Sequence, residues 1–272
     1  MRKLIATLLL AASLPATASD DACRGAAPDT FVPGESQCLT MRLFGTSTPR
    51  TLVVWLHGDV SSGGPANYHF AAARTFAEEQ AAADVLSVAL VRPGYPDGDG
   101  NASSVAFLQA GRQDHYTRQN VSEVAGAIQR LKTRFRPART LVVGHSGGAA
   151  TAAVLLGLAP DLLDGAVLVA CPCELNAWRL GRRPWTASEN PFDWAARTPL
   201  GARVHALTGT LDDNTAPRLA QIYVATLQQR GIDAKFESIE NATHNGAFRA
   251  PEVMRAVAHM LQTGPAAGTN LR

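Results

Sequence analysis

The sequence predicts an α/β fold with a mostly parallel sheet covered by helices on both faces. From Thr51 onward, short apolar segments alternate with longer segments of helical periodicity. The apolar segments are hydrophobic at consecutive residues, not at every second one, and glycine-rich or polar loops follow them. Strands that are apolar on both faces belong in a sheet buried on both sides, which is typical of parallel α/β architecture.

The predicted strands are short, and all but the last are rich in Val, Leu or Ala. They span residues 51–56, 85–91, 140–143, 166–170, 204–207 and 235–239. The predicted helices span residues 65–83, about 120–131, 147–158, 215–230 and 251–261. Pro65 suits the first turn of its helix. Asn120 is the expected N-cap of the next helix, with Glu123 at the reciprocal position of a capping box.

The first 18 residues have the layout of a secretory signal peptide. Arg2 and Lys3 give a positive start, an apolar run extends to about Leu14, and Ala16-Thr17-Ala18 provides small residues for cleavage. The apolar run is too short to span a bilayer comfortably, and a retained anchor is the alternative. We therefore expect a mature domain over residues 19–272 that is periplasmic or secreted and not held in a membrane.

Charge and cysteine content narrow the possible partners. The formal net charge is +2, which gives no reason to expect nucleic acid or an anionic membrane as partner. In an oxidising compartment, four cysteines allow three pairings. Cys23–Cys38 is favoured because it closes a short N-terminal loop, whereas Cys171 and Cys173 would form a strained ring or stay reduced. Without further His or Cys nearby, this second pair is a poor zinc site, and no metal is expected.

A candidate nucleophile lies between a predicted strand and a predicted helix of small residues. The segment Gly144-His145-Ser146-Gly147-Gly148 has the pattern G-x-S-x-G. In such a tight turn the serine hydroxyl is exposed, and the flanking glycines remove side chains that would clash. The alternative is a glycine-rich turn whose serine has no catalytic role, and the predicted strand before it and helix after it argue against this alternative.

With this motif the chain resembles the α/β-hydrolase family over about residues 51–261. The family's chain order is serine, then acid, then histidine. The matching segments are His57-Gly58 for the oxyanion loop, Gly144–Gly148 for the nucleophile elbow, Gly209–Pro217 for the acid and Thr243-His244-Asn245-Gly246 for the histidine loop. The resemblance implies an α/β-hydrolase fold.

The resemblance also implies a catalytic triad. Ser146 would attack a carbonyl, His244 would remove the proton of the serine, and Asp212 would orient the imidazole. Asp213 is an alternative acid, and the family's spacing from Gly209 favours Asp212.

Two backbone N–H groups are expected to stabilise the oxyanion. Gly147 follows the serine at a helix N-terminus, and Asp59 follows His57-Gly58, with Val60 as an alternative to Asp59. Tyr95, in the loop after the second predicted strand, is expected to bind substrate because this loop often borders the active site in the family.

Residues 174–202 interrupt the regular alternation of strands and helices and are too long for a plain connection. Many family members carry a lid at this position, so a lid-like insert is expected. Trp178 and Trp185 are predicted to bind substrate, or alternatively to anchor the insert to the core. If they line the pocket, the neighbouring Arg179, Arg182 and Arg183 favour a substrate with an anionic or carbonyl-rich portion.

Together these features predict an exported serine hydrolase that needs no cofactor and cleaves a carboxylic ester through an acyl-enzyme. A peptidase or amidase with the same triad is one alternative, because both reactions pass through an acyl-enzyme. A catalytically silent binding protein of the same fold is the other. The expected partner is a small-molecule ester or peptide, and the oligomeric state stays open.

Overall fold

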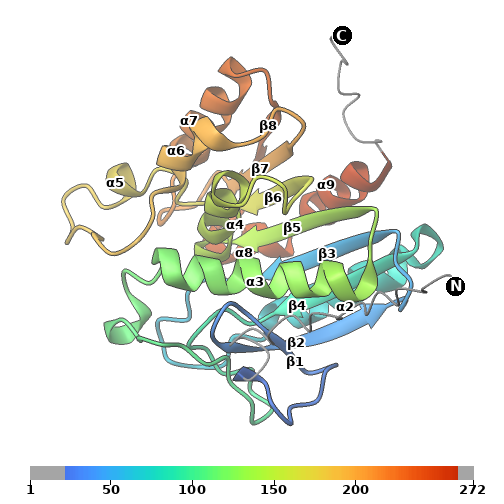
Figure 1. Ribbon diagram of the computed structural model, residues 1–272. Coiled ribbons are helices and arrows are strands. Elements are labelled where there is room, and N and C mark those ends of the chain that lie inside the picture. The colour runs from blue at the N-terminus through green and yellow to red at the C-terminus, as the bar shows by residue number, and fades with distance from the viewer. Residues whose placement is uncertain (1–21, 263–272) are drawn as a thin grey trace, which may run out of the picture.

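The computed structural model describes residues 22–262, so the predicted signal peptide lies outside the described residues. Within them, eight strands form one sheet in the order β1-β2-β4-β3-β5-β6-β7-β8 (Figure 1). The strands are β1 (Phe31–Pro33), β2 (Cys38–Gly45), β3 (Thr51–Leu56), β4 (Val85–Leu90), β5 (Arg139–His145), β6 (Gly165–Val169), β7 (Arg203–Gly209) and β8 (Asp233–Ile239).

The sheet is mostly parallel, which confirms the predicted fold class. Strands β3 to β8 all run in the same direction, whereas β2 pairs antiparallel with β4 and β1 pairs antiparallel with β2. At the centre, Val54 of β3 lies opposite Val88 of β4 and Val142 of β5. Because these strands are parallel, the loops after them meet at one edge of the sheet.

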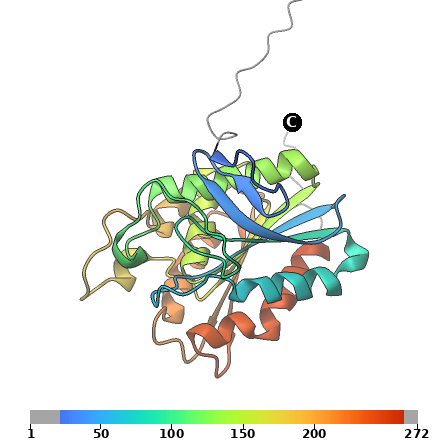
Figure 2. The same cartoon turned by 90° about the horizontal axis from the view of Figure 1, so that it is seen from below.

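Helices cover both faces of the sheet. They are α2 (Tyr68–Glu79), α3 (Arg118–Phe135), α4 (Gly147–Leu158), α5 (Leu175–Trp178), α6 (Pro191–Trp194), α7 (Pro217–Gln229), α8 (His244–Arg249) and α9 (Pro251–Gln262). Apolar residues of α3, α4 and α7 share one core cluster with Val54, and those of α2, α8 and α9 share another with Trp55. Figure 2 shows α3 on one side of the sheet and α2 and α9 on the other. Consecutive β3 residues thus face two cores, which explains why the strand is apolar throughout.

Two predicted helix starts were wrong. Helix α2 begins at Tyr68 instead of Pro65, because the N–H of Ala66 donates to the carbonyl of Pro96 and holds this segment against a neighbouring loop. Helix α3 has Thr117 as its N-cap, whose side chain accepts from the N–H of Asn120, so Asn120 lies inside the helix.

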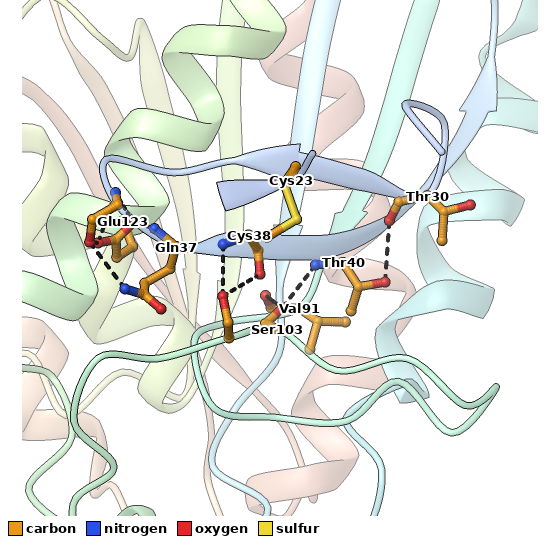
Figure 3. The surroundings of a disulfide bond; sticks show 10 residues. Cys23, Thr30, Gln37, Cys38, Thr40, Val91, Ser103 and Glu123 are labelled. Atoms are coloured by element: carbon orange, nitrogen blue, oxygen red, sulfur yellow. Dashed lines mark hydrogen bonds between the residues drawn. A yellow bond between two sulfur atoms is a disulfide. The ribbon is translucent and has the colours of Figure 1, made fainter. Parts of the chain in front are cut away.

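The N-terminal strands were not predicted, and contacts with distant segments hold them in place (Figure 3). The carboxylate of Glu123, expected in a capping box, instead accepts from the backbone N–H groups of Ser36 and Gln37. The N–H of Thr40 donates to the hydroxyl of Ser103 at 3.0 Å. These contacts join the antiparallel edge of the sheet to α3 and to the loop after β4.

Two disulfides are present in the described chain. Cys23–Cys38 ties the N-terminal segment to β2, which confirms the favoured pairing. Cys171 and Cys173 also pair with each other, so the alternative of two reduced cysteines was wrong. Within residues 22–262, no helix has both the length and the apolar character needed to cross a membrane.

Candidate active site

Ser146 lies in the turn between β5 and α4, where the backbone is strained. Its φ is 52° and its ψ is −117°, in a region that residues other than glycine rarely adopt and that costs about 1–3 kcal/mol. Crowding explains the glycines around it. A Cβ on Gly144 would lie 2.4 Å from the carbonyl oxygen of Gly148, and a Cβ on Gly148 would lie 2.3 Å from that of Leu56. A side chain at either position would therefore collide with backbone atoms of the elbow.

The structure brings Ser146, His244 and Asp212 together. His244 Nε2 lies 2.9 Å from Ser146 Oγ, and His244 Nδ1 lies 2.9 Å from Asp212 Oδ2. The sequence placed His244 in a loop, but it is the first residue of α8, where the side chain of Thr243 caps the helix. Asp213 is exposed and is not a hydrogen-bond partner of His244 in the described chain, so Asp212 is the acid within reach.

The surroundings of Asp212 keep its carboxylate ionised. Oδ1 accepts from the backbone N–H groups of Asn214 and Thr215, and the hydroxyl of Thr215 lies 2.8 Å from Oδ2. Burial opposes the charged form, but the hydrogen bonds from His244 and Thr215 outweigh it, so the pKa of Asp212 is lowered. Because an ionised carboxylate only accepts, Nδ1 of His244 must donate, which leaves the lone pair of Nε2 facing Ser146.

Tyr68 and His145 connect the loop after β3, the end of β5 and the start of α8 beside the serine, and sequence reasoning missed Tyr68. The Tyr68 hydroxyl accepts from the N–H of Gly58 and lies 2.7 Å from His145 Nδ1. His145 Nε2 lies 3.1 Å from the carbonyl oxygen of His244. Burial, and next the charge of His244, lowers the pKa of His145 to about 4, so its ring is neutral near pH 7. Nothing in the sequence marks Tyr68, because its role depends on contacts between distant segments.

His57 fixes the loop after β3. The N–H of Arg92 donates to His57 Nε2 at 2.9 Å, so Nδ1 carries the proton and donates to the carbonyl of Gly58 at 2.7 Å. Burial first, and then the charge of Arg92, holds the pKa of His57 well below its ordinary value. A Cβ on Gly58 would lie 2.9 Å from the Cβ of Ser146, so this loop passes directly beside the serine.

The two predicted oxyanion donors are neighbours. A Cβ on Gly147 would lie 2.5 Å from Asp59 Oδ1, which shows how closely the two segments approach. Neither the N–H of Gly147 nor that of Asp59 donates a hydrogen bond to another described residue. Asp59 lines the pocket beside Ser146, whereas Val60 packs against a small apolar cluster and is not part of the pocket wall.

The side chain of Asp59 accepts three hydrogen bonds that the sequence did not predict. Its partners are Arg92 Nη2 at 2.5 Å, the Tyr95 hydroxyl at 3.2 Å and the Tyr116 hydroxyl at 2.5 Å. The structure does not place Tyr95, predicted to bind substrate, at the pocket. Its side chain is fully buried, its ring lies 4.6 Å from that of His57, and it is absent from the pocket wall. Tyr95 turns inward because its hydroxyl finds a charged partner behind the loop.

A pocket of about 450 Å³ opens above Ser146. Its wall is formed by Gly58, Asp59, Ser61, Tyr68, Gly111, Arg112, Gln113, His145, Ser146, Trp178, Arg179, Trp185, Asn214, His244 and Asn245. Trp178 and Trp185 both line it, with ring centroids 5.0 Å apart. Trp178 Nε1 also donates to the carbonyl of Asn214 at 2.8 Å, so this side chain anchors the insert to the loop that follows Asp212.

The arginines of the segment 174–202 differ in their positions. Arg179 lines the pocket, whereas Arg182 and Arg183 are exposed and lie outside its wall. Arg112 and Gln113, from the loop before α3, complete the wall, and no sequence pattern pointed to them.

Among residues 22–262, no three His, Cys, Asp or Glu side chains are grouped so that they could hold a metal ion.

Comparison with known proteins places this geometry in a family. Residues 53–237, well over half of the chain, match the model of the alpha/beta hydrolase family. No curated protein matches the chain. Several solved structures share the fold.

An esterase of Pyrococcus furiosus, Pf2001, has a TM-score of 0.63 and 13% identity, over 86% of this chain and 89% of its own. The protein Est1E of Butyrivibrio proteoclasticus, solved with ferulic acid bound, has a TM-score of 0.64 and 13% identity, over 85% and 97% of the two chains. An acylaminoacyl peptidase has a TM-score of 0.64 and 11% identity, over 88% of this chain and 42% of its own. The chain belongs to the alpha/beta hydrolase family.

Proposed function

We propose that the protein is an exported serine hydrolase that cleaves a carboxylic ester through an acyl-enzyme. The observation that carries this proposal is the continuous hydrogen-bonded path from Ser146 Oγ through His244 to Asp212, with both contacts at 2.9 Å. This path ends at a serine that lines a pocket large enough for a small-molecule substrate.

In the proposed acylation step, Ser146 Oγ attacks the carbonyl carbon and its proton passes to His244 Nε2. Asp212 stabilises the imidazolium that results. The N–H groups of Gly147 and Asp59 donate to the oxyanion, a contribution of about 3 kcal/mol each in the transition state. His244 then gives the proton to the leaving alcohol oxygen, and the carbonyl reforms as the acyl-enzyme.

In the proposed deacylation step, water replaces the departed alcohol. His244 removes a proton from the water, which attacks the acyl carbon of the enzyme ester. Collapse of the second tetrahedral intermediate returns the proton to Ser146 Oγ and releases a carboxylic acid. No electron transfer is involved, and each proton that His244 takes up is given back within the cycle.

An ester is the favoured substrate, and peptide or amide cleavage is the second candidate. The names of two fold neighbours, an esterase and a ferulic acid complex, support the first. A peptidase among the neighbours supports the second. A panel of p-nitrophenyl esters of graded chain length beside aminoacyl anilides separates them: turnover of the anilides at rates like those of the esters would favour the peptidase.

The nucleophile is tested with a fluorophosphonate probe. We expect wild-type protein and the Ser122→Ala variant to be labelled and the Ser146→Ala variant to remain unlabelled. Ser122 lies in α3 outside the pocket wall and is a matched control. Absence of labelling in folded wild-type protein would instead favour a silent binding protein.

Export is part of the same proposal. It rests on the leader-like residues 1–18 and on the two disulfides, which persist in oxidising compartments and are rare in the cytosol. The proposed mature enzyme spans residues 19–272, with 174–202 as a lid-like insert over the pocket. N-terminal mass spectrometry of protein recovered from a periplasmic or culture fraction should find a chain that begins at Ser19.

A further inference from the structure

Two arginines line the pocket from different segments of the chain. Arg112 belongs to the loop before α3, and Arg179 belongs to the insert. Arg112 Nε donates to the backbone carbonyl of Gly94 at 2.7 Å, and Arg179 Nε donates to that of Arg183 at 3.0 Å. Within residues 22–262, neither guanidinium has an acidic partner or a further hydrogen bond, so the terminal Nη groups keep their donors available.

Aromatic rings hold both guanidiniums in position. The Arg179 guanidinium carbon lies 5.3 Å from the ring centroid of Trp178 and 5.0 Å from that of Trp185. That of Arg112 lies 4.7 Å from the ring centroid of Tyr95. Side chains fixed by stacking and by one hydrogen bond lose little further conformational freedom when a ligand binds, which favours binding.

The acidic side chains nearby are already occupied. Asp59 lines the pocket, but its carboxylate pairs with the buried Arg92. Asp114 accepts from the backbone N–H groups of Ala187 and Ser188. Neither carboxylate forms an ion pair with Arg112 or Arg179 in the described chain, so neither guanidinium is paired directly with a carboxylate of the protein.

A further effect of charge is seen at Arg179. Partial burial, and next the positive charge of Arg182, lowers the pKa of Arg179, although it stays a cation near pH 7. A cation with like charge nearby and no ion-pair partner gains from a bound anion, and two guanidiniums can share a carboxylate through several charge-assisted hydrogen bonds.

We propose that Arg112 and Arg179 form an anion-binding subsite, and that the preferred substrate is an ester whose acyl or alcohol part carries a carboxylate. The statement about substrate rests on the proposed serine hydrolase function. The anion-binding subsite itself does not depend on it, so binding and catalysis give separate tests.

Binding is measured by titration calorimetry at low ionic strength with benzoate and with benzamide, its neutral counterpart of similar shape. Wild-type protein should bind benzoate about ten-fold or more tightly than benzamide. Arg179→Gln and Arg112→Gln should lose most of this preference, whereas Arg179→Lys, which keeps the charge, should retain part of it. Added salt should weaken the benzoate complex alone.

The matched control is Arg182→Gln, in the same segment but exposed and outside the pocket wall. It should keep the benzoate preference of the wild type. Equal affinity for benzoate and benzamide, absence of binding of both, or an equal loss in Arg182→Gln and Arg179→Gln would each overturn the subsite.

Catalysis is measured with the p-nitrophenyl hemiester of glutarate and with p-nitrophenyl 5-methylhexanoate, in which an isopropyl group replaces the carboxylate. In Arg179→Gln, the ratio of kcat/KM for the hemiester to kcat/KM for the neutral ester should fall about ten-fold relative to the wild type. Equal kcat/KM of the wild type for both esters would overturn the substrate class while leaving the hydrolase intact. If the fluorophosphonate probe does not label Ser146 but the protein still prefers benzoate to benzamide, the proposed hydrolase function is overturned and the anion-binding subsite stands.

Discussion

The hydroxyl of Tyr116 donates to Asp59 Oδ2 at 2.5 Å, across a separation of 57 residues in the chain. This contact holds the loop that carries one proposed oxyanion donor against the start of α3. Tyr116 is fully enclosed, and burial first, then the charge of Asp59, raises its pKa well above the ordinary value. The hydroxyl is therefore always protonated near pH 7 and always available as a donor to the carboxylate.

Removal of that hydroxyl should slow catalysis more than it weakens substrate binding. In Tyr116→Phe, the loop loses one hydrogen bond to a charged group, and we expect kcat to fall about ten-fold with KM within about two-fold. Tyr223→Phe is the matched control, because it removes a buried hydroxyl that lies 3.3 Å from the carbonyl of Ala153, away from the pocket. Steady-state kinetics on an ester measure kcat and KM of both variants. An equal fall in kcat in Tyr116→Phe and Tyr223→Phe would mean that Tyr116 only stabilises the fold.

Asp212→Asn should lower kcat by about 10⁴-fold. The amide nitrogen of asparagine would donate to His244 Nδ1, so the ring proton would move to Nε2 and the imidazole would no longer accept from Ser146. Asp213→Asn changes the adjacent exposed carboxylate in the same way and should leave kcat within about two-fold. A large effect of Asp213→Asn with a small effect of Asp212→Asn would exchange the two roles.

The free energy of unfolding should fall between pH 7 and pH 5. Burial lowers the pKa of His69 to about 3, and burial with the charge of His244 lowers that of His145 to about 4. Below about pH 6.5 these side chains take up protons in the unfolded state and not in the folded state, so protonation favours unfolding. Each of the two histidines should lower the free energy of unfolding by about 2 kcal/mol between pH 7 and pH 5.

Urea denaturation at the two pH values tests this. The variant His69→Gln cannot be protonated, so its difference in unfolding free energy between pH 7 and pH 5 should be smaller than that of the wild type by about 2 kcal/mol. Its overall stability can change without affecting the comparison. An unchanged difference would mean that His69 is already protonated in the folded protein at pH 5.

The central sheet could be predicted because burial on both faces leaves a local pattern, as in β3, whose bounds match the prediction. Strand β2 has a mixed burial pattern and depends on contacts such as Thr40 to Ser103, so it leaves no such pattern. Ser146, Asp212 and His244, which the structure brings together, could be predicted because each follows the end of a strand. Tyr68 and Arg92 were missed because their roles arise only when distant segments pack together.

Gly148→Ala should destabilise the protein, because the elbow has no room for a methyl group. The added Cβ would lie 2.3 Å from the carbonyl oxygen of Leu56 and 2.5 Å from that of His57, and both are backbone atoms that cannot move without displacing β3. Overpacking of this kind typically costs about 1–3 kcal/mol. Gly201→Ala is the matched control, since nothing lies within 4 Å of its Cβ position. Thermal unfolding should show a lowered Tm for the first variant and an unchanged Tm for the second, and equal Tm values would mean that the backbone at the elbow yields.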